Sequence, residues 1–206
     1  MDSADRRQYD SLRRKAKAQE TRSEIAHAAR RLFVERGWAA TTVRDVAREA
    51  EVSVPTVYAA YGNKTGLALA LADAADLSAD LPEQLAELEA AHDDPRLQLA
   101  AMTAYDRRLF ERAGDLITLL RDAGRTESDL AEVYQDGRRR ADEVRAQVFS
   151  AWPTAVLRSG VAASVDVYAA LCNIDVYNTL TTERAWKPDR IERWWAEATA
   201  RELLLP

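Results

Sequence analysis

The chain has 206 residues, 47% of them hydrophobic, and carries 29 Lys and Arg against 34 Asp and Glu, a net charge of −5. That hydrophobic content supports a folded core, and the sequence shows neither a bilayer-spanning apolar run nor a signal peptide, so we expect a cytoplasmic protein without membrane contact. The only cysteine, Cys172, and the two histidines, His27 and His92, are too few for an internal disulfide or a zinc site, so no metal or cofactor is expected.

The charge is unevenly distributed along the chain. Residues 1–66 contain 13 Lys and Arg and 9 Asp and Glu, a balance of +4, whereas residues 67–206 contain 16 and 25, a balance of −9. The DNA backbone attracts the basic part and repels the acidic part. Any contact with DNA is therefore expected from the first 66 residues.

Helical periodicity dominates the sequence. Only seven glycines and six prolines interrupt it, apolar residues recur at spacings of three and four, and no alternating run of strand length occurs. We therefore predict an all-α protein of about nine helices. Residues 1–18, which include Arg13, Arg14, Lys15 and Lys17, lack an apolar stripe and are expected to form a flexible basic arm.

A compact three-helix domain is predicted over residues 19–66. Its first helix runs over residues 20–36, where one apolar stripe is followed by Gly37 as a stop signal. The second helix begins at Thr42, because Thr42 and Asp45 have the spacing of a capping box.

The third helix follows after a break of two or three residues. Ser53 is expected to cap it, and Pro55 lies in its first turn, where a missing N–H costs nothing. The helix should end near Gly62, and Asn63 should cap a fourth helix. Two short helices joined by a tight turn are the arrangement that presents a helix N-terminus to the major groove of DNA.

A set of residues at fixed spacings runs through this domain: Ile25, Ala28, Ala29, Leu32, Phe33, Gly37, Thr41, Thr42, Val43, Val46, Ala47, Ala50, Val52, Ser53, Thr56, Val57, Tyr58, Tyr61, Lys64 and Leu67. The pattern closely resembles the helix-turn-helix head of the TetR family of transcriptional regulators. The resemblance implies a homodimer that binds a double-stranded DNA operator, acts as a repressor and is released by a small-molecule effector. Residues 67–206 would then form an α-helical effector-binding and dimerisation domain.

The resemblance also implies which residues bind DNA: Thr42, Arg44, Ser53, Val54, Pro55, Thr56, Tyr58 and Lys64. Hydroxyl groups, a phenol and helix N-termini donate hydrogen bonds to phosphate oxygens. The methyl and methylene groups of Val54, Pro55 and Thr56 suit thymine methyls, and Arg44 is long enough to reach a guanine edge.

Two positions depart from the family pattern. Glu51 stands where the family usually has glycine in the turn, and a left-handed backbone there costs a residue other than glycine on the order of 1 kcal/mol. Ala60 stands where many members have a phosphate-contacting histidine. We therefore expect DNA affinity to depend more on the basic arm.

Further helices are expected between the breaks at Leu81-Pro82, Asp93-Asp94-Pro95, Gly114, Gly124, Trp152-Pro153, Gly160 and Lys187-Pro188. The last helix is rich in large apolar residues: Ile191, Trp194, Trp195 and Ala198. Because Trp194 and Trp195 point about 100° apart on a helix, one monomer core accommodates both with difficulty, and a dimer interface is predicted. The alternative is that these tryptophans close the core of the monomer.

An effector pocket is predicted in the middle of this region, lined by Met102, Tyr105, Phe110, Leu120, Tyr134, Trp152, Tyr168, Cys172 and Asp175. Tyr168, Cys172 and Asp175 are spaced to share one face of a single helix. A phenol and a carboxylate on that face would suit a polar or cationic ligand, although most of these residues would also serve as ordinary core.

Three other functions compete with effector-controlled DNA binding. A DNA-binding regulator without a ligand is compatible with every feature above. A helical enzyme is disfavoured, because the sequence contains no Ser/His/Asp or Cys/His set, no Gly-rich phosphate loop and no HExxH motif. A helical interaction module that does not bind DNA leaves the basic, capped head unexplained.

Overall fold

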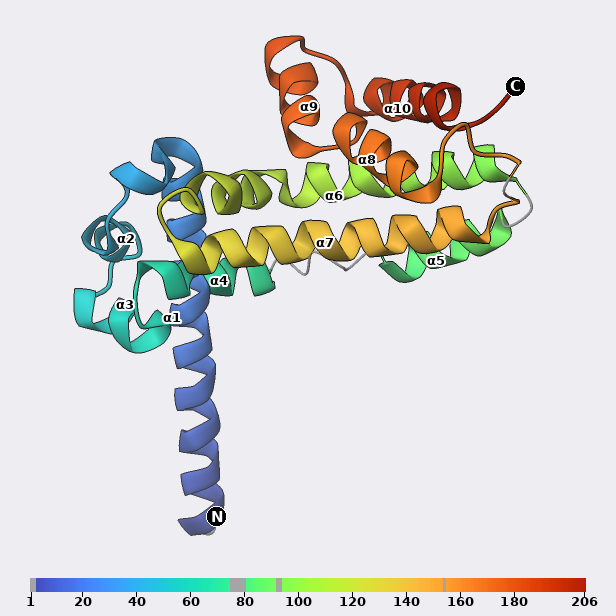
Figure 1. Ribbon diagram of the computed structural model, residues 1–206. Helices are drawn as coiled ribbons and strands as arrows, with labels where there is room; N and C mark the ends of the chain where they lie inside the picture. Colours follow the sequence, from blue (N-terminus) through green and yellow to red (C-terminus); the bar gives the residue numbers. More distant parts are fainter. Residues whose placement is uncertain (1–2, 75–80, 92–93, 154) are drawn as a thin grey trace. The chain divides into compact units, whose positions relative to one another are not determined.

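The computed structural model describes residues 3–74, 81–91, 94–153 and 155–206, and within these ranges the chain is helical and contains no strand (Figure 1). The prediction of an all-α protein is confirmed. The helices are α1 (Ser3–Ala40), α2 (Val43–Glu49), α3 (Val54–Tyr61), α4 (Lys64–Ala74), α5 (Leu81–Ala90), α6 (Pro95–Ala123), α7 (Ser128–Ala151), α8 (Val161–Leu171), α9 (Ile174–Asn178) and α10 (Pro188–Leu203), with a π-helix, η1, at Thr179–Glu183.

The chain divides into two compact units, which we call the head and the body. The head comprises Met1–Ala74 and Leu119–Ala131, and the body comprises Ala75–Thr118 and Glu132–Pro206. The head therefore contains α4 and the turn between α6 and α7, in addition to the predicted domain of residues 19–66. The end of α6 and the start of α7 join the head because Leu119, Leu120, Ala123 and Leu130 are buried there.

The head is built around the apolar stripe of α1. Ile25, Ala29, Leu32 and Phe33 are all buried, as their helical spacing requires. Helices α2 and α4 pack on α1, and α3 packs on α2 and α4 (Figure 1). This arrangement places the short helices α2 and α3 side by side.

Residues 3–18 do not form the flexible arm that the sequence predicted, because α1 continues through them from Ser3. The segment contains neither glycine nor proline and is rich in Ala, Arg, Lys and Gln, which are strong helix formers. An apolar stripe is thus unnecessary for this segment to extend α1. At the other end, Gly37 adopts φ 79° and ψ 169°, which interrupts the helix where the sequence placed its stop.

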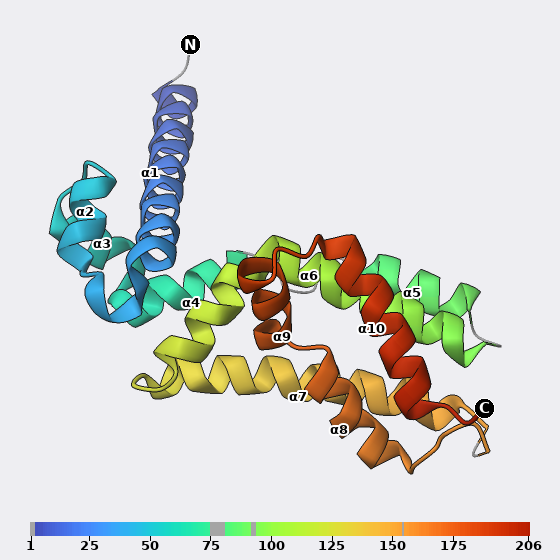
Figure 2. The ribbon, with the colours of Figure 1, turned by 90° about the horizontal axis from the view of Figure 1, so that it is seen from above.

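In the body, side chains of α6 contact α5, α7, α8, α9 and α10. The apolar stripe of α6 includes Leu99, Met102, Phe110 and Ala113, all buried. Gly114 was expected to break a helix, but it lies inside α6: a Cβ atom there would come within 3.1 Å of Ile174 Cδ1, so the glycine permits close packing. Helices α8 and α10 pack against each other (Figure 2).

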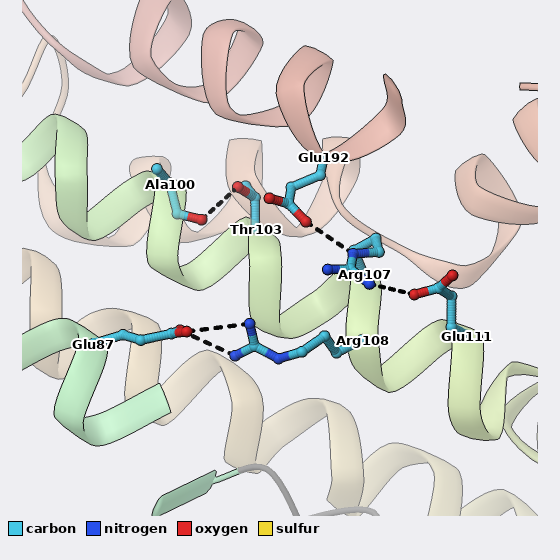
Figure 3. A network of polar contacts seen from close by, with 7 residues as sticks. All are labelled: Glu87, Ala100, Thr103, Arg107, Arg108, Glu111 and Glu192. Atoms are coloured by element: carbon cyan, nitrogen blue, oxygen red, sulfur yellow. Dashed lines mark hydrogen bonds and ion pairs between the residues drawn. The ribbon is translucent and has the colours of Figure 1, made fainter. Parts of the chain in front are cut away.

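Ion pairs join α6 to two other helices of the body (Figure 3). Arg107 of α6 donates to Glu192 of α10 at 2.8 Å and also pairs with Glu111, one turn further along α6. Arg108, the next residue, makes a two-pronged contact of 3.0 and 3.2 Å with Glu87 of α5. These successive arginines project about 100° apart on α6, so each contacts a different neighbouring helix.

Candidate nucleic-acid interface

The start of α2 is held by a complete capping box. The backbone N–H of Asp45 donates to Thr42 Oγ1 at 3.1 Å, and the backbone N–H of Thr42 donates to Asp45 Oδ2 at 3.0 Å. The Thr42 hydroxyl also donates to Asp45 Oδ2, at 2.5 Å, and this bond, followed by the one from the Thr42 backbone N–H, lowers the pKa of the Asp45 carboxyl to about 2, with a smaller contribution from Arg48. The cap leaves Thr42 and Arg44 exposed on the surface of the head, as a contact with DNA requires.

The turn between α2 and α3 contains the expected strained residue. Glu51 has φ 53°, the left-handed conformation that glycine would adopt more easily. Ser53 then caps α3, because its Oγ accepts from the backbone N–H of Thr56 at 3.3 Å. Pro55 occupies the first turn, as predicted.

Helix α3 has one face in the core and one in solvent. Val57 is buried, whereas Tyr58 is 50% exposed, so Tyr58 is not a core residue. Ser53 and Pro55 are also exposed, and Val54 and Thr56 are half-buried. The solvent face of α3 therefore consists mainly of Ser53, Pro55 and Tyr58 among the predicted residues.

Arg22 of α1 holds the end of α3 in place. Its guanidinium donates to the Ala60 carbonyl and lies 4.6 Å from the centre of the Tyr61 ring. The Tyr61 hydroxyl in turn donates to the Arg22 carbonyl at 2.8 Å. Burial raises the pKa of Tyr61, against the influence of Arg22. The contact of Arg22 with the end of α3 could not be predicted from the sequence, because Ala60 and Tyr61 lie almost forty residues further along the chain.

Lys64 at the start of α4 points into the head. Its ammonium group donates to the Trp38 carbonyl and lies 4.0 Å from the centre of the Trp38 ring. Burial lowers the pKa of Lys64, whereas Glu127 opposes that shift. We therefore assign Lys64 to the junction of α1 and α4, in place of the phosphate contact that the resemblance implied.

The predicted pocket residues are divided between the two units. Leu120 is buried in the head, whereas Met102, Phe110, Trp152, Tyr168 and Cys172 are buried in the body and Tyr105 and Tyr134 are half-buried there. Asp175 does not share a helix with Tyr168 and Cys172, because α8 ends at Leu171 and Asn173 caps α9. Asp175 is exposed, so the proposed face of phenol and carboxylate on one helix is wrong.

A different carboxylate meets the Tyr168 phenol. The Tyr168 hydroxyl donates to Asp106 Oδ2 at 3.0 Å, and Arg145 lies 3.4 Å from the same oxygen and 4.8 Å from the centre of the Tyr168 ring. Burial raises the pKa of Asp106, although Arg145 and Tyr168 oppose the shift, and burial also raises the pKa values of Tyr168 and Cys172. This buried polar cluster lies in the body.

The position of Asp106 in the sequence indicates this cluster. Asp106 falls within the apolar stripe of α6, four residues after Met102 and four before Phe110. A carboxylate in a buried register needs a partner. Beside the cluster, α7 and α8 line a surface groove of about 590 Å³, whose wall includes Asp142, Val165 and Asp166.

The predicted dimer surface is wrong for three of its four residues. Ile191, Trp195 and Ala198 are at most 1% exposed in the single chain, so their side chains form no surface. Trp195 packs between Phe110 and Tyr177, with ring centres 6.0 and 6.2 Å away. The body thus encloses one tryptophan fully. Trp194 is only half-buried and packs edge-on against Trp186.

Within the part of the chain that the structure describes, no group of His, Cys, Asp and Glu is placed to hold a metal ion. None of the described helices is both long and apolar enough to cross a bilayer.

Comparisons with known proteins agree with the geometry of the head. Residues 25–71 match the model of the bacterial regulatory proteins of the tetR family. A stretch of 61 residues is 46% identical to the HTH-type transcriptional regulator TtgR of Pseudomonas putida, covering 30% of this chain and 29% of that protein. The chain thus aligns with less than a third of the length of this curated relative.

Solved structures resemble nearly the whole chain. A putative transcriptional regulator from Saccharomonospora viridis, in complex with choline, has a TM-score of 0.71 and 18% identity over 91% of this chain and all of that one. NalD, the secondary repressor of the MexAB-OprM multidrug efflux pump in Pseudomonas aeruginosa, has a TM-score of 0.65 and 24% identity over 91% of this chain and 98% of that one. These likenesses show a shared fold. The head thus matches the TetR family model over residues 25–71, and its capped helices agree with that match.

Proposed function

We propose that this protein is a transcriptional regulator that binds double-stranded DNA through α2 and α3 and represses transcription until a small molecule releases it. The observation that carries the proposal is the exposed surface formed by Thr42 and Arg44 on α2 and by Ser53, Pro55 and Tyr58 on α3. These residues lie on two capped helices joined by a tight turn, which is the layout of DNA-binding helix-turn-helix domains.

The chemistry of this surface suits phosphate contacts. The exposed Arg44 guanidinium and the Tyr58 phenol can both donate to phosphate oxygens. The charge balance of +4 over residues 1–66 favours the approach of DNA to the head. A protein that binds a bacterial chromosome in this way works in the cytoplasm.

A single helix-turn-helix domain buries little surface on DNA, so we infer that two copies of the chain bind successive half-sites as a homodimer. Trp194, half-buried beside Trp186, is the remaining candidate for the dimer contact. The effector component is supported by the relative of similar fold that was solved with choline. The ligand-independent regulator is the second candidate, since Phe110, Tyr177 and Trp195 fill the centre of the body with packed rings.

The test begins with salt. Binding to a duplex selected from a random pool should weaken as salt rises, with a slope of about 0.9 log units per log salt for each phosphate neutralised. Arg44→Ala should lower that slope by about 0.9, the value for one phosphate contact. Tyr58→Ala should weaken DNA binding while the helix content, measured by circular dichroism, stays the same. Arg140→Ala, which removes an exposed arginine from α7, is the matched control. Unchanged affinity in both head variants would refute the proposal.

A further inference from the structure

Helix α3 contains no side chain that can make a two-pronged hydrogen bond to a base. The helix reads VPTVYAAY, and its cap, Ser53, adds one hydroxyl. Proteins read guanine by two hydrogen bonds from Arg or Lys, and adenine by two from Asn or Gln. None of these residue types occurs in α3, so apart from the Tyr58 hydroxyl its side chains offer a base edge apolar contact.

The exposed face of α3 is continuous and apolar. Pro55 and Ala59 lie one helical turn apart and are both exposed, so they share a face. The Tyr58 ring lies beside them, also exposed, while Val57 points to the core on the other side of the helix. Solvent therefore meets a proline ring, a methyl group and a phenol along this helix.

The hydroxyl groups near this face are already engaged. Ser53 Oγ and Thr56 Oγ1 lie 2.8 Å apart and are hydrogen-bonded, and Ser53 Oγ also accepts from the backbone N–H of Thr56. Thr56 is half-buried. Because these groups hold the cap, the exposed Pro55 and Ala59 carbons, with Tyr58 beside them, are left to meet a base edge.

We infer that α3 reads thymine, and that Pro55 and Ala59 recognise it through its C5 methyl group. This methyl is the apolar feature that the major groove presents, and only thymine carries it among the four bases. The exposed Arg44 of the neighbouring helix α2 supplies a positive charge that attracts a duplex to the head. Thymine reading by α3 rests on the proposed DNA-binding function and specifies the base that this helix selects.

The test replaces thymine by deoxyuridine, one position at a time, in a duplex selected by this protein from a random pool. The replacement removes one methyl group and leaves every hydrogen-bonding atom in place. At one or two positions in each half-site we expect binding to weaken about fourfold, equivalent to about 0.8 kcal/mol for one buried carbon.

A protein variant then connects the methyl to Pro55. Pro55→Ala should reduce the ratio of affinities for thymine and deoxyuridine towards one at the position that Pro55 contacts. Pro188→Ala is the matched control, because Pro188 also lies in the first turn of a helix, but in the body. The control should retain the ratio of the unchanged protein.

The outcomes separate the two proposals. Selective binding that deoxyuridine leaves unaltered at every position would overturn thymine reading and leave DNA binding standing. A ratio that Pro55→Ala leaves unaltered at every sensitive position would overturn the assignment to Pro55. A pool that yields no preferred duplex, with no salt-dependent binding, would refute the proposed function itself.

Discussion

Replacing Lys64 by methionine tests whether this residue belongs to the fold of the head or to its DNA contacts. The variant keeps the length of the side chain and removes the ammonium group. It loses a charged hydrogen bond to the Trp38 carbonyl, a type of bond that contributes about 1.5–3 kcal/mol, and a cation held 4.0 Å from the centre of the indole ring, which contributes about 0.5–1 kcal/mol at an exposed site.

The half-exposed position of Lys64 reduces both contributions, because water competes for the ammonium group. We therefore expect Lys64→Met to lower the free energy of unfolding of the head by about 1–3 kcal/mol. The assay is urea unfolding of the full chain labelled with fluorotryptophan and followed by ¹⁹F NMR. Trp38 is the only one of the five tryptophans in the head, so its resonance reports on that unit alone.

The matched control is Lys17→Met, which removes an exposed lysine of α1 that is paired with Glu20 on the surface. Its effect should stay within about 0.5 kcal/mol. Salt titrations of DNA binding complete the experiment. An unchanged unfolding curve for Lys64→Met, together with a salt slope lower by about 0.9, would show that Lys64 binds phosphate and that our reasoning is wrong.

Three further predictions concern the cap, the polar cluster and the core. Thr42→Ala should return the pKa of Asp45 from about 2 towards 3.8, measured by NMR titration of the carboxyl; a value that stays near 2 would contradict the capping box. Burial raises the pKa of Asp106 above 3.8, so its contribution to stability is present below that pH and is lost as pH rises through the raised value. In the Asp106→Asn variant, the free energy of unfolding should therefore decrease less as pH rises through this range. Parallel pH profiles for the variant and the unchanged protein would contradict this assignment. Trp195→Ala should destabilise the body by about 3–5 kcal/mol in denaturant unfolding, whereas a loss below about 1 kcal/mol would mean that Trp195 is not in the core.

Local signals predicted where α2 and α3 begin. Gly37, Thr42 and Ser53 act on backbone groups within a few residues of themselves, so their effects can be read from the sequence without knowledge of the fold. The left-handed turn at Glu51 was predicted by comparison with a pattern that usually has glycine there. These residues define the helices that form the candidate interface.

The body was harder to predict, because burial there depends on which segments meet in space. Trp194 and Trp195 are equally apolar, and only the packed structure shows that Phe110 and Tyr177 enclose Trp195. The prediction that Tyr168 and Asp175 share one helix face was wrong for a related reason. Helix α8 ends at Leu171, and no glycine or proline marks that end in the sequence.

Helices α6 and α7 turn back on each other within the head, at Leu119–Ala131. Gly124 makes this reversal possible, because a Cβ atom there would lie 2.8 Å from Ala131 Cα. The chain consequently enters the head a second time, and Thr65 of α4 comes within 3.5 Å of Glu127 in the returning segment. A truncated protein ending at Ala74 would lack Leu119, Leu120 and Leu130 and would leave apolar surface of its first four helices uncovered. Cutting the chain in two after Ala74 to isolate the head would therefore remove part of the head itself.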